Sequence, residues 1–267
     1  SEMAAKQFLG NKAVCSGKTT FEDVFDAVNN GETELGIIPI ENTLYGSIHR
    51  NFDLLLENSV QIVGETNLRI ELHLIALPGV KLSDIKTVYS HPAALEQCRK
   101  FLTSIPHAKA VSTYDTAGSV KMIHDDHLTD CAAVAGHAAA DDYGMSILRQ
   151  EIEDFPENYT RFFIISKNEH IFGESNKTSI VFSTKNIPGA LFKSLSVFFL
   201  RDINLTKIES RPLKGKPFEY LFYLDFNGHL GQERCRNALR HLEELTNFIK
   251  VLGSYPAANH IGTNNHD

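Results

Sequence analysis

Residues 36–47, which read GIIPIENTLYGS, place a group of hydrogen-bonding side chains directly after an apolar run. The run ending at Ile40 has the length and composition of a buried strand, and Glu41, Asn42 and Thr43 follow it at once. Similar polar groups lie at the edges of other apolar segments. They are Ser90-His91-Pro92, Ser112-Thr113-Tyr114-Asp115-Thr116 and Asn158-Tyr159-Thr160-Arg161. Each group alone is typical of a helix N-terminus, but all of them together, with an arginine, favour a shared polar cleft.

The side chains in these groups suit the binding of an anionic organic acid. Arg161 and main-chain N–H groups at helix N-termini could hold a carboxylate, and the hydroxyl groups could donate protons. The sequence has no GxSxG elbow, HExxH motif or Gly-rich phosphate loop, so hydroxyl-based acid catalysis fits better than nucleophilic catalysis. Partners brought close in space could still activate a nucleophile. His124 and His127 are typical of the solvated end of a helix, and we expect no metal site.

The composition is that of an ordinary globular protein. The chain has 267 residues, of which 42% are hydrophobic and 22% are charged, and its net charge is −7. This charge argues against nucleic acid or an anionic membrane as the main partner. No apolar run approaches the roughly 20 residues that a membrane span needs. The four cysteines form no CxxC pair, which favours free thiols over disulfides or zinc.

The first two thirds of the chain alternate between helical and strand-like patterns. Helices are expected at 21–28, 48–57, 93–102, 118–124 and 137–143, and strands at 35–40, 61–65, 68–77, 87–89, 108–111 and 131–135. Helices between short apolar strands indicate an α/β fold with mainly parallel strands. In such folds ligands bind beyond the carboxyl ends of the strands, where the polar groups described above are expected.

The last third has a different order of elements. Strands are expected at 177–185, 205–213, 218–226 and 249–255, and helices at 189–202 and 232–248. This βαββαβ order predicts a ferredoxin-like domain, whose exposed sheet edges would favour pairing with a second copy. Gly189 would let the backbone approach a ligand closely at a helix start. The polar residues 259–267 are expected to be disordered.

Several motifs in these segments resemble the prephenate dehydratase family. They are Pro39-Ile40-Glu41-Asn42-Thr43 with Gly46-Ser47, Ser90-His91-Pro92 with Ala94-Leu95 and Gln97-Cys98, Asp115-Thr116-Ala117, and Asn158-Tyr159-Thr160-Arg161-Phe162. Gly189-Ala190-Leu191 and Glu209-Ser210-Arg211-Pro212 resemble the regulatory ACT domain of the same family. The resemblance implies a two-lobed, periplasmic-binding-protein-like catalytic domain at residues 1–170, with the substrate in a cleft between its lobes, and an ACT domain at 177–258.

The resemblance also implies a reaction and a set of functional residues. The family converts prephenate to phenylpyruvate in L-phenylalanine biosynthesis, without a cofactor, under feedback by phenylalanine. By the family pattern Thr160 donates a proton to the leaving hydroxyl, Arg161 holds a carboxylate or shapes the cleft, and Phe162 packs behind them. The implied substrate-binding residues are Glu41, Asn42, Ser47, Ser90, Thr116 and Asn158. The implied phenylalanine-binding residues are Gly189, Ala190, Leu191, Glu209, Ser210, Arg211 and Pro212.

Two departures from the family pattern and two alternatives accompany this interpretation. The family's opening strand is reduced here to Ser1-Glu2, which puts the activity of this chain in question, and Gly136 stands where relatives usually carry Ser.

Arogenate dehydratase fits the same motifs. A non-enzymatic amino-acid sensor is an alternative from another class. The resemblance implies a homodimer or homotetramer. We expect a cytoplasmic protein, or a plastid protein if a transit peptide precedes Ser1.

Overall fold

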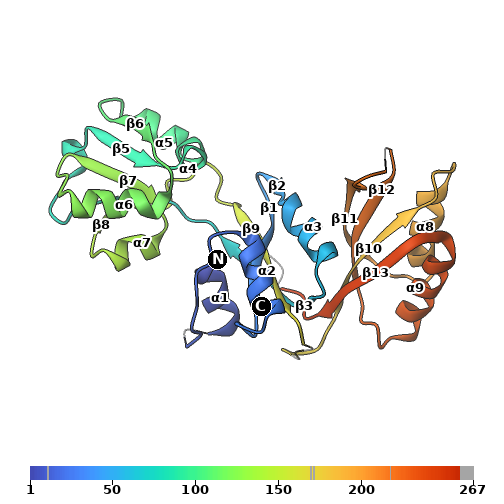
Figure 1. The fold of residues 1–267 in the computed structure, drawn as a ribbon. Helices are drawn as coiled ribbons and strands as arrows, with labels where there is room; N and C mark the ends of the chain where they lie inside the picture. The colour runs from blue at the N-terminus through green and yellow to red at the C-terminus, as the bar shows by residue number, and fades with distance from the viewer. Residues whose placement is uncertain (11, 169, 171, 217, 259–267) are drawn as a thin grey trace, which may run out of the picture. The chain divides into compact units, whose positions relative to one another are not determined.

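The computed structural model describes residues 1–10, 12–168, 170, 172–216 and 218–258 (Figure 1). The chain forms two compact units. The first unit consists of Ser1–Leu68 together with the chain from Thr160 onward, and the second unit is Arg69–Tyr159. The chain therefore passes from one unit to the other twice, once on each side of the second unit.

The first unit contains a sheet with the strand order β2-β1-β9-β3. Its elements are α1 (Glu2–Leu9), α2 (Phe21–Asn29), β1 (Gly36–Asn42), β2 (Gly46–Ser47), α3 (His49–Glu57), β3 (Gln61–Arg69) and β9 (Tyr159–Ser166). A capping box formed by Thr20 and Asp23 starts α2, whose apolar side packs toward β1. Strands β1 and β9 are antiparallel, so that Asn42 lies opposite Thr160.

A second sheet of the first unit has the ferredoxin-like strand order β11-β12-β10-β13. Its elements are β10 (Lys177–Thr184), α8 (Ala190–Phe199), β11 (Leu205–Pro212), β12 (Tyr220–Asn227), α9 (Glu233–Leu245) and β13 (Thr246–Tyr255). All of its described strand pairs are antiparallel. Helices α8 and α9 cover one face, where Phe182, Phe198 and Phe226 are buried (Figure 1).

The opposite face of this second sheet packs against the first sheet of the same unit. Tyr223 and Tyr255 belong to the same buried cluster as Ile38, Phe52 and Phe163. The backbones approach closely at Gly253, where a Cβ atom would lie 2.1 Å from the carbonyl oxygen of Ile62. The two sheets of the first unit therefore share one apolar core.

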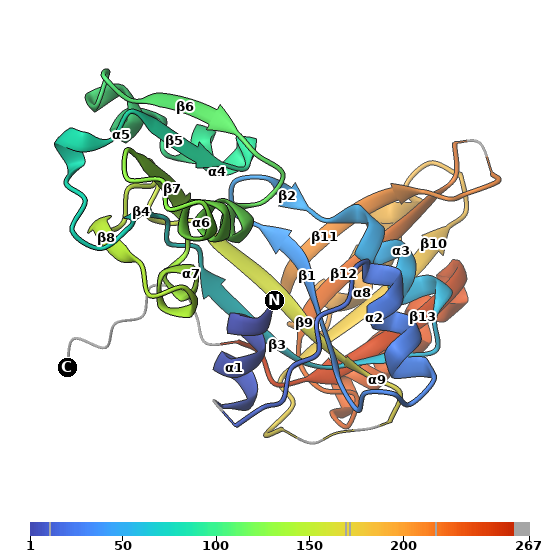
Figure 2. The same cartoon turned by 60° about the vertical axis from the view of Figure 1, so that its left-hand side comes forward.

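The second unit is a sheet with helices on both faces (Figure 2). Its strand order is β6-β5-β7-β4-β8. Its elements are β4 (His73–Ala76), a 3₁₀ turn (Leu82–Asp84), β5 (Thr87–Ser90), α4 (Pro92–Gln97), α5 (Arg99–Ser104), β6 (Lys109–Ser112), α6 (Thr116–Asp125), β7 (Cys131–Ala135), α7 (His137–Asp142) and β8 (Ser146–Arg149). Alternate residues of the central strands point to opposite faces. Ala132 and Val134 meet the side of α4, and Ala133 and Ala135 meet that of α6.

The expectation of mainly parallel strands is wrong, because the sheets are mixed. Among the described strand pairs, the parallel ones are β5 with β6 and β5 with β7, whereas β4 runs antiparallel to both of its neighbours. Helices connect β5 to β6 and β6 to β7, and such crossovers return a chain in the same direction. Strand β4 instead follows β3 after a gap of three residues, without a helix between them.

Two further expectations differ in detail. The helix expected at 93–102 is two helices that meet at Cys98, and the extended run expected at 68–77 is divided between β3 and β4. Strand β8 was not expected from its sequence. The disorder expected for 259–267 concerns residues outside those that the structure describes. The α/β class of the fold is confirmed.

Candidate functional site

Strand pairing places Thr160 beside Asn42 in the first unit. The side-chain amide of Asn42 donates a hydrogen bond to Oγ1 of Thr160 at 3.0 Å. The amide oxygen of Asn42 accepts from the main-chain N–H groups of Leu44 and Tyr45, which fixes which end of the amide faces Thr160. Thr160 is almost completely buried. Its hydroxyl accepts one bond in a fixed geometry, and its own proton can be directed to another group.

Arg161 lies on the opposite face of β9 from Thr160, because side chains alternate along a strand. Its guanidinium donates from Nε to Glu65 at 2.7 Å and from Nη1 to Asp225 at 2.7 Å, and it contacts the hydroxyl of Tyr255 at 3.3 Å. The ring of Phe163 lies 4.7 Å from the guanidinium carbon. Only 13% of the Arg161 side chain is exposed, so this cation is held between two buried carboxylates.

The same carboxylates have further partners, and together they form a buried charge network. Lys177 donates to Glu65 at 2.9 Å, and the Ser179 hydroxyl donates to Asp225 at 2.5 Å. The hydroxyls of Ser179 and Tyr255 lie 2.6 Å apart. We refer to these residues as the Arg161 network. Its members are Glu65, Arg161, Lys177, Ser179, Asp225 and Tyr255. Two cations face two anions, which balances the charges that are removed from water.

The ionisation of the network follows from its burial and its charges. Burial alone would raise the pKa of Asp225, but the charges of Arg161 and Lys177 and two hydrogen bonds outweigh it and lower this pKa. Burial would lower the pKa of Arg161, but the charge of Asp225, together with Tyr255 and Glu65, holds this pKa well above its ordinary value. Burial and the charge of Asp225 raise the pKa of Tyr255 well above the ordinary value. The network therefore contains a neutral Tyr255 and a charged Arg161–Asp225 pair at neutral pH.

Glu41 and Ser47 contact strand β11 of the second sheet. Lys207 lies 3.0 Å from the Glu41 carboxylate and donates to the Ser47 hydroxyl at 3.1 Å. The Ser47 hydroxyl in turn donates to Glu209 at 2.8 Å. Both residues were expected to bind substrate, and the structure shows them in contact with β11. Phe162, expected to pack behind Thr160, is buried.

The other expected substrate-binding residues lie in the second unit. The Ser90 hydroxyl is fully buried and donates to the main-chain oxygen of Val134 at 2.6 Å. Asn158 is also fully buried, and its amide donates to the side-chain oxygen of Gln97 at 3.1 Å. Thr116 is the first residue of α6, whose N-cap Asp115 accepts from the N–H of Gly118. The helix-cap interpretation therefore describes the surroundings of Thr116 well.

The residues expected to bind phenylalanine lie in two places, at the start of helix α8 and in strand β11. Gly189 is the N-cap of α8 with φ +76°, a left-handed conformation, and Ala190 and Leu191 begin the helix. Glu209 lies in β11 and contacts Ser47 and also His49 at 3.2 Å. Ser210, Arg211 and Pro212 complete this stretch of β11, and Arg211 lies 3.5 Å from Asp53. No hydrogen bond or ion pair between 189–191 and 209–212 is found in the described part of the chain.

Sequence reasoning missed most of the Arg161 network. Glu65 and Asp225 lie inside strands that are otherwise rich in apolar residues, QIVGETNLR and YLFYLDFN. A buried acidic residue in a strand needs a cation or a hydrogen-bond donor as a partner, and this need was the signal in the sequence that such a network exists. The partner could not be read from the sequence, because Asp225 is 64 residues and Glu65 is 96 residues from Arg161.

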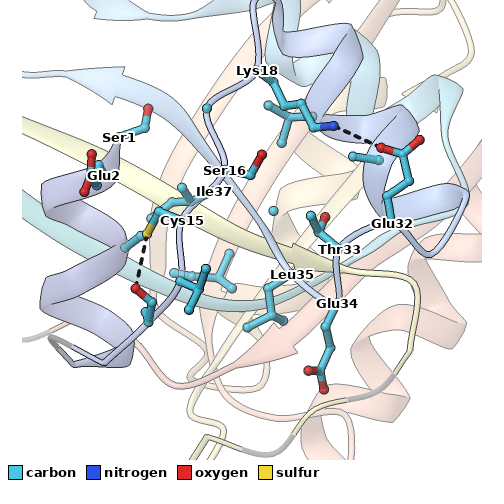
Figure 3. A pocket seen from close by; sticks show the side chains of 18 of the residues that line it. Ser1, Glu2, Cys15, Ser16, Lys18, Glu32, Thr33, Glu34, Leu35 and Ile37 are labelled. Carbon is cyan, nitrogen blue, oxygen red and sulfur yellow. Dashed lines mark hydrogen bonds and ion pairs between the residues drawn. The ribbon is translucent and has the colours of Figure 1, made fainter.

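A cavity of about 850 Å³ lies in the first unit beside the beginning of β1 (Figure 3). Its walls include the segment 13–20, α1, α2 and residues 32–37. Lys18 and Glu32 form an ion pair of 3.0 Å at its edge, and Cys15 is also among its lining residues. Among the described residues, the neighbour of β1 on the side away from β9 is the two-residue strand β2, paired with Glu41 and Asn42. None of the expected site residues lines this cavity.

Two features of other protein classes are absent from the described residues. No group of three or more His, Cys, Asp or Glu side chains that could hold a metal ion was found among them. Within the same residues, no helix has the length and apolar character needed to cross a membrane. Of the four free thiols, Cys15 is exposed, and Cys98, Cys131 and Cys235 are buried.

In sequence, the chain matches a family model and several curated relatives. A sequence model of the family described as prephenate dehydratase matches residues 1–170. Arogenate dehydratase/prephenate dehydratase 2, chloroplastic, of Arabidopsis thaliana is 47% identical over 247 residues, which cover 88% of this chain and 65% of that protein. This chain therefore spans less than two thirds of the length of that relative.

Two solved structures share the fold. The prephenate dehydratase of Arthrobacter aurescens in complex with L-Phe matches with a TM-score of 0.84 and 32% identity, covering 95% of this chain and 85% of that one. A structure described as GqqA, a novel type of quorum-quenching acylase, matches with a TM-score of 0.86 and 32% identity, covering 97% of this chain and 94% of that one.

Proposed function

Because the chain belongs to the prephenate dehydratase family, we propose that it is a hydro-lyase that converts prephenate to phenylpyruvate for L-phenylalanine biosynthesis. The observation that supports this most directly is the hydrogen bond from Asn42 to Thr160 inside the matched region. It holds a hydroxyl group in one orientation at a buried position, as the protonation of a leaving group requires.

The proposed reaction needs one proton donor and no redox partner. The bond between the ring and its carboxylate breaks, and that electron pair enters the ring. The bond between the ring and the hydroxyl oxygen breaks, and this oxygen leaves as water with a proton from the enzyme. Carbon dioxide, water and the aromatic product account for every atom of the substrate and for the proton that the enzyme supplies, and solvent then returns a proton to the donor. We infer that Thr160 donates to the departing oxygen, and that its effect comes from preorganised hydrogen bonding as charge develops there.

Of the two roles expected for Arg161, its contacts favour shaping the site. The guanidinium already donates to Glu65 and Asp225, and a substrate carboxylate would have to displace one of these buried anions. Breaking a buried ion pair costs about 3–5 kcal/mol. We therefore propose that Arg161 fixes strand β9, while Phe162 packs beneath it. Glu41, Asn42, Ser47, Ser90, Thr116 and Asn158 are proposed to complete the substrate-binding surfaces of their respective units.

We further propose that residues 1–170 are the catalytic domain and that 177–258 form an ACT domain which binds phenylalanine. The ferredoxin-like strand order and the left-handed Gly189 at the start of α8 support this. Exposed apolar side chains on α8, with Phe192 at 76% and Phe199 at 78% exposure, support pairing of two copies as a dimer or tetramer. The contacts of Glu209 and Arg211 suggest that they couple this domain to α3 and β2.

Arogenate dehydratase remains the alternative within the family, since the Arabidopsis relative is named for both activities. That relative is also named chloroplastic, which supports a plastid as the alternative to the cytoplasm. The non-enzymatic sensor is the alternative from another class, but the ordered pair of Thr160 and Asn42 favours an enzyme.

Side-by-side turnover of prephenate and arogenate by the purified chain tests the proposal. We expect a measurable kcat/KM for at least one of them, with phenylpyruvate or phenylalanine as the product. A large preference for arogenate would replace the first substrate by the second. Acylase activity on a quorum-sensing signal should be measured in the same preparation, because one protein of this fold is described as such an acylase. Binding of phenylalanine without turnover of either acid would identify a sensor.

A further inference from the structure

The Arg161 network joins the proposed reaction strand to the second sheet of the first unit. Arg161 directly follows Thr160 in β9, and Glu65 comes from β3. The remaining partners come from the second sheet: Lys177 and Ser179 from β10, Asp225 from β12 and Tyr255 from β13. Strands β12 and β13 of that sheet therefore contact the Arg161 side chain directly, and β10 contacts its partners.

Asp225 is the central residue of this arrangement. One of its carboxylate oxygens accepts from Arg161 at 2.7 Å, and the other accepts from Ser179 at 2.5 Å. The hydroxyl of Tyr255 contacts both Ser179 and Arg161, which closes the ring of hydrogen bonds. Only 6% of the Asp225 side chain is exposed. Both oxygens are thus held in place, and the guanidinium has little freedom to move.

We propose that Asp225 is a positioning residue for the reaction: through Arg161 it fixes strand β9 and thereby the hydroxyl of Thr160. This inference rests on the proposed dehydratase function. A hydroxyl that must meet a departing oxygen tolerates little displacement, since a shift of about 1 Å can cost about 100-fold in rate. The backbone of β9 also pairs with β1 at Asn42, the residue that orients the Thr160 hydroxyl. Loss of the Asp225 anchor therefore acts on both partners of that hydrogen bond.

The test compares Asp225→Asn with a matched control in the full chain. Asp225→Asn keeps the shape of the side chain and removes its charge. Thr178→Val is the control, because Thr178 is equally buried in β10, next to Ser179, and its hydroxyl donates to Gly228 and contacts Ser254 outside the network. We expect Asp225→Asn to lower kcat by about 10- to 100-fold while KM changes less than about threefold. Thr178→Val should change neither constant to this extent.

Hydrogen exchange gives a second result that does not depend on turnover. Residues 161–165 pair with β1, and we expect their main-chain amides to exchange faster in Asp225→Asn but not in Thr178→Val. If the parent chain turns over neither acid, the proposed function fails, and the exchange rates still test the anchoring of β9. If Asp225→Asn does not fold, Ser179→Ala removes one hydrogen bond to Asp225 and should give the same pattern with a smaller change. A folded Asp225→Asn variant with the same kcat as the parent, and with the same amide exchange rates in β9, would overturn the proposal.

Discussion

Replacing Thr160 with Val removes one hydroxyl group and preserves the shape of the side chain. Thr160 is almost completely buried, and its hydroxyl accepts from Asn42 at 3.0 Å, so the change leaves that amide without this partner. The loss in folding stability should be about 1 kcal/mol, as for a typical hydrogen bond. The loss of a positioned proton donor should lower kcat by about 100-fold or more. The effect on catalysis therefore exceeds the effect on folding, and the two can be measured separately.

The assay follows formation of product from prephenate and from arogenate, with kcat and KM determined for each variant. Thr160→Ser is the matched control, because it keeps the hydroxyl and loses only a methyl group. We expect its kcat to stay within about tenfold of the parent, with KM little changed in both variants. A folded Thr160→Val whose kcat lies within about threefold of the parent would refute the role of this hydroxyl in protonating the leaving group.

Three further predictions concern other parts of the chain. Gly253→Ala should lower the free energy of unfolding in urea by at least about 1–3 kcal/mol, because its Cβ would lie 2.1 Å from the Ile62 oxygen, and an unchanged midpoint would contradict this contact. Gly189→Asn should fold like the parent, since Asn tolerates a φ of +76°, yet it should lose inhibition by phenylalanine. Gly189→Val should lose both inhibition and stability, and normal phenylalanine binding by Gly189→Asn would argue against an effector site there. Burial raises the pKa of the Cys98 thiol from 9.0 to about 12, so the free energy of unfolding should fall as the pH rises through this interval, where the unfolded chain loses a proton that the folded chain keeps. A parent whose free energy of unfolding stays constant over this interval, or a Cys98→Ala variant whose free energy falls as steeply as that of the parent, would count against it.

The sequence predicted the parts of the site that depend on local patterns. Asn42 and Thr160 each lie at an end of an apolar run, and composition alone placed both in a polar group. Strand β7 was expected at 131–135 and is found at Cys131–Ala135, because five consecutive apolar residues bounded by polar ones match a central strand. The strand depends only on neighbouring residues, and its bounds were predicted correctly, whereas the membership of Asn42 and Thr160 in a site stays a prediction.

Features that depend on distant partners were not predictable in the same way. Arg161 was expected to hold a substrate carboxylate or to shape the cleft, and nothing near it in the sequence indicated that Glu65 and Asp225 would accept hydrogen bonds from its guanidinium. The direction of β4 was likewise missed, since a strand that follows another without a helix carries no sign of where it will pair. The cavity beside β1 also depends on how α1 and the segment 13–20 fold back, which periodicity does not describe.

The central claim, that this chain removes water and carbon dioxide from its substrate with Thr160 as the donor, is tested most directly by a single-turnover experiment. Enzyme in excess is mixed with prephenate, or with arogenate if that acid is turned over faster, and the aromatic product and carbon dioxide are quantified over time. We expect the aromatic product and carbon dioxide to form in equal amounts and in the same phase, and Thr160→Val to slow the formation of both equally. If neither acid gives the aromatic product, or if Thr160→Val forms it at the same rate as the parent, the central claim is contradicted.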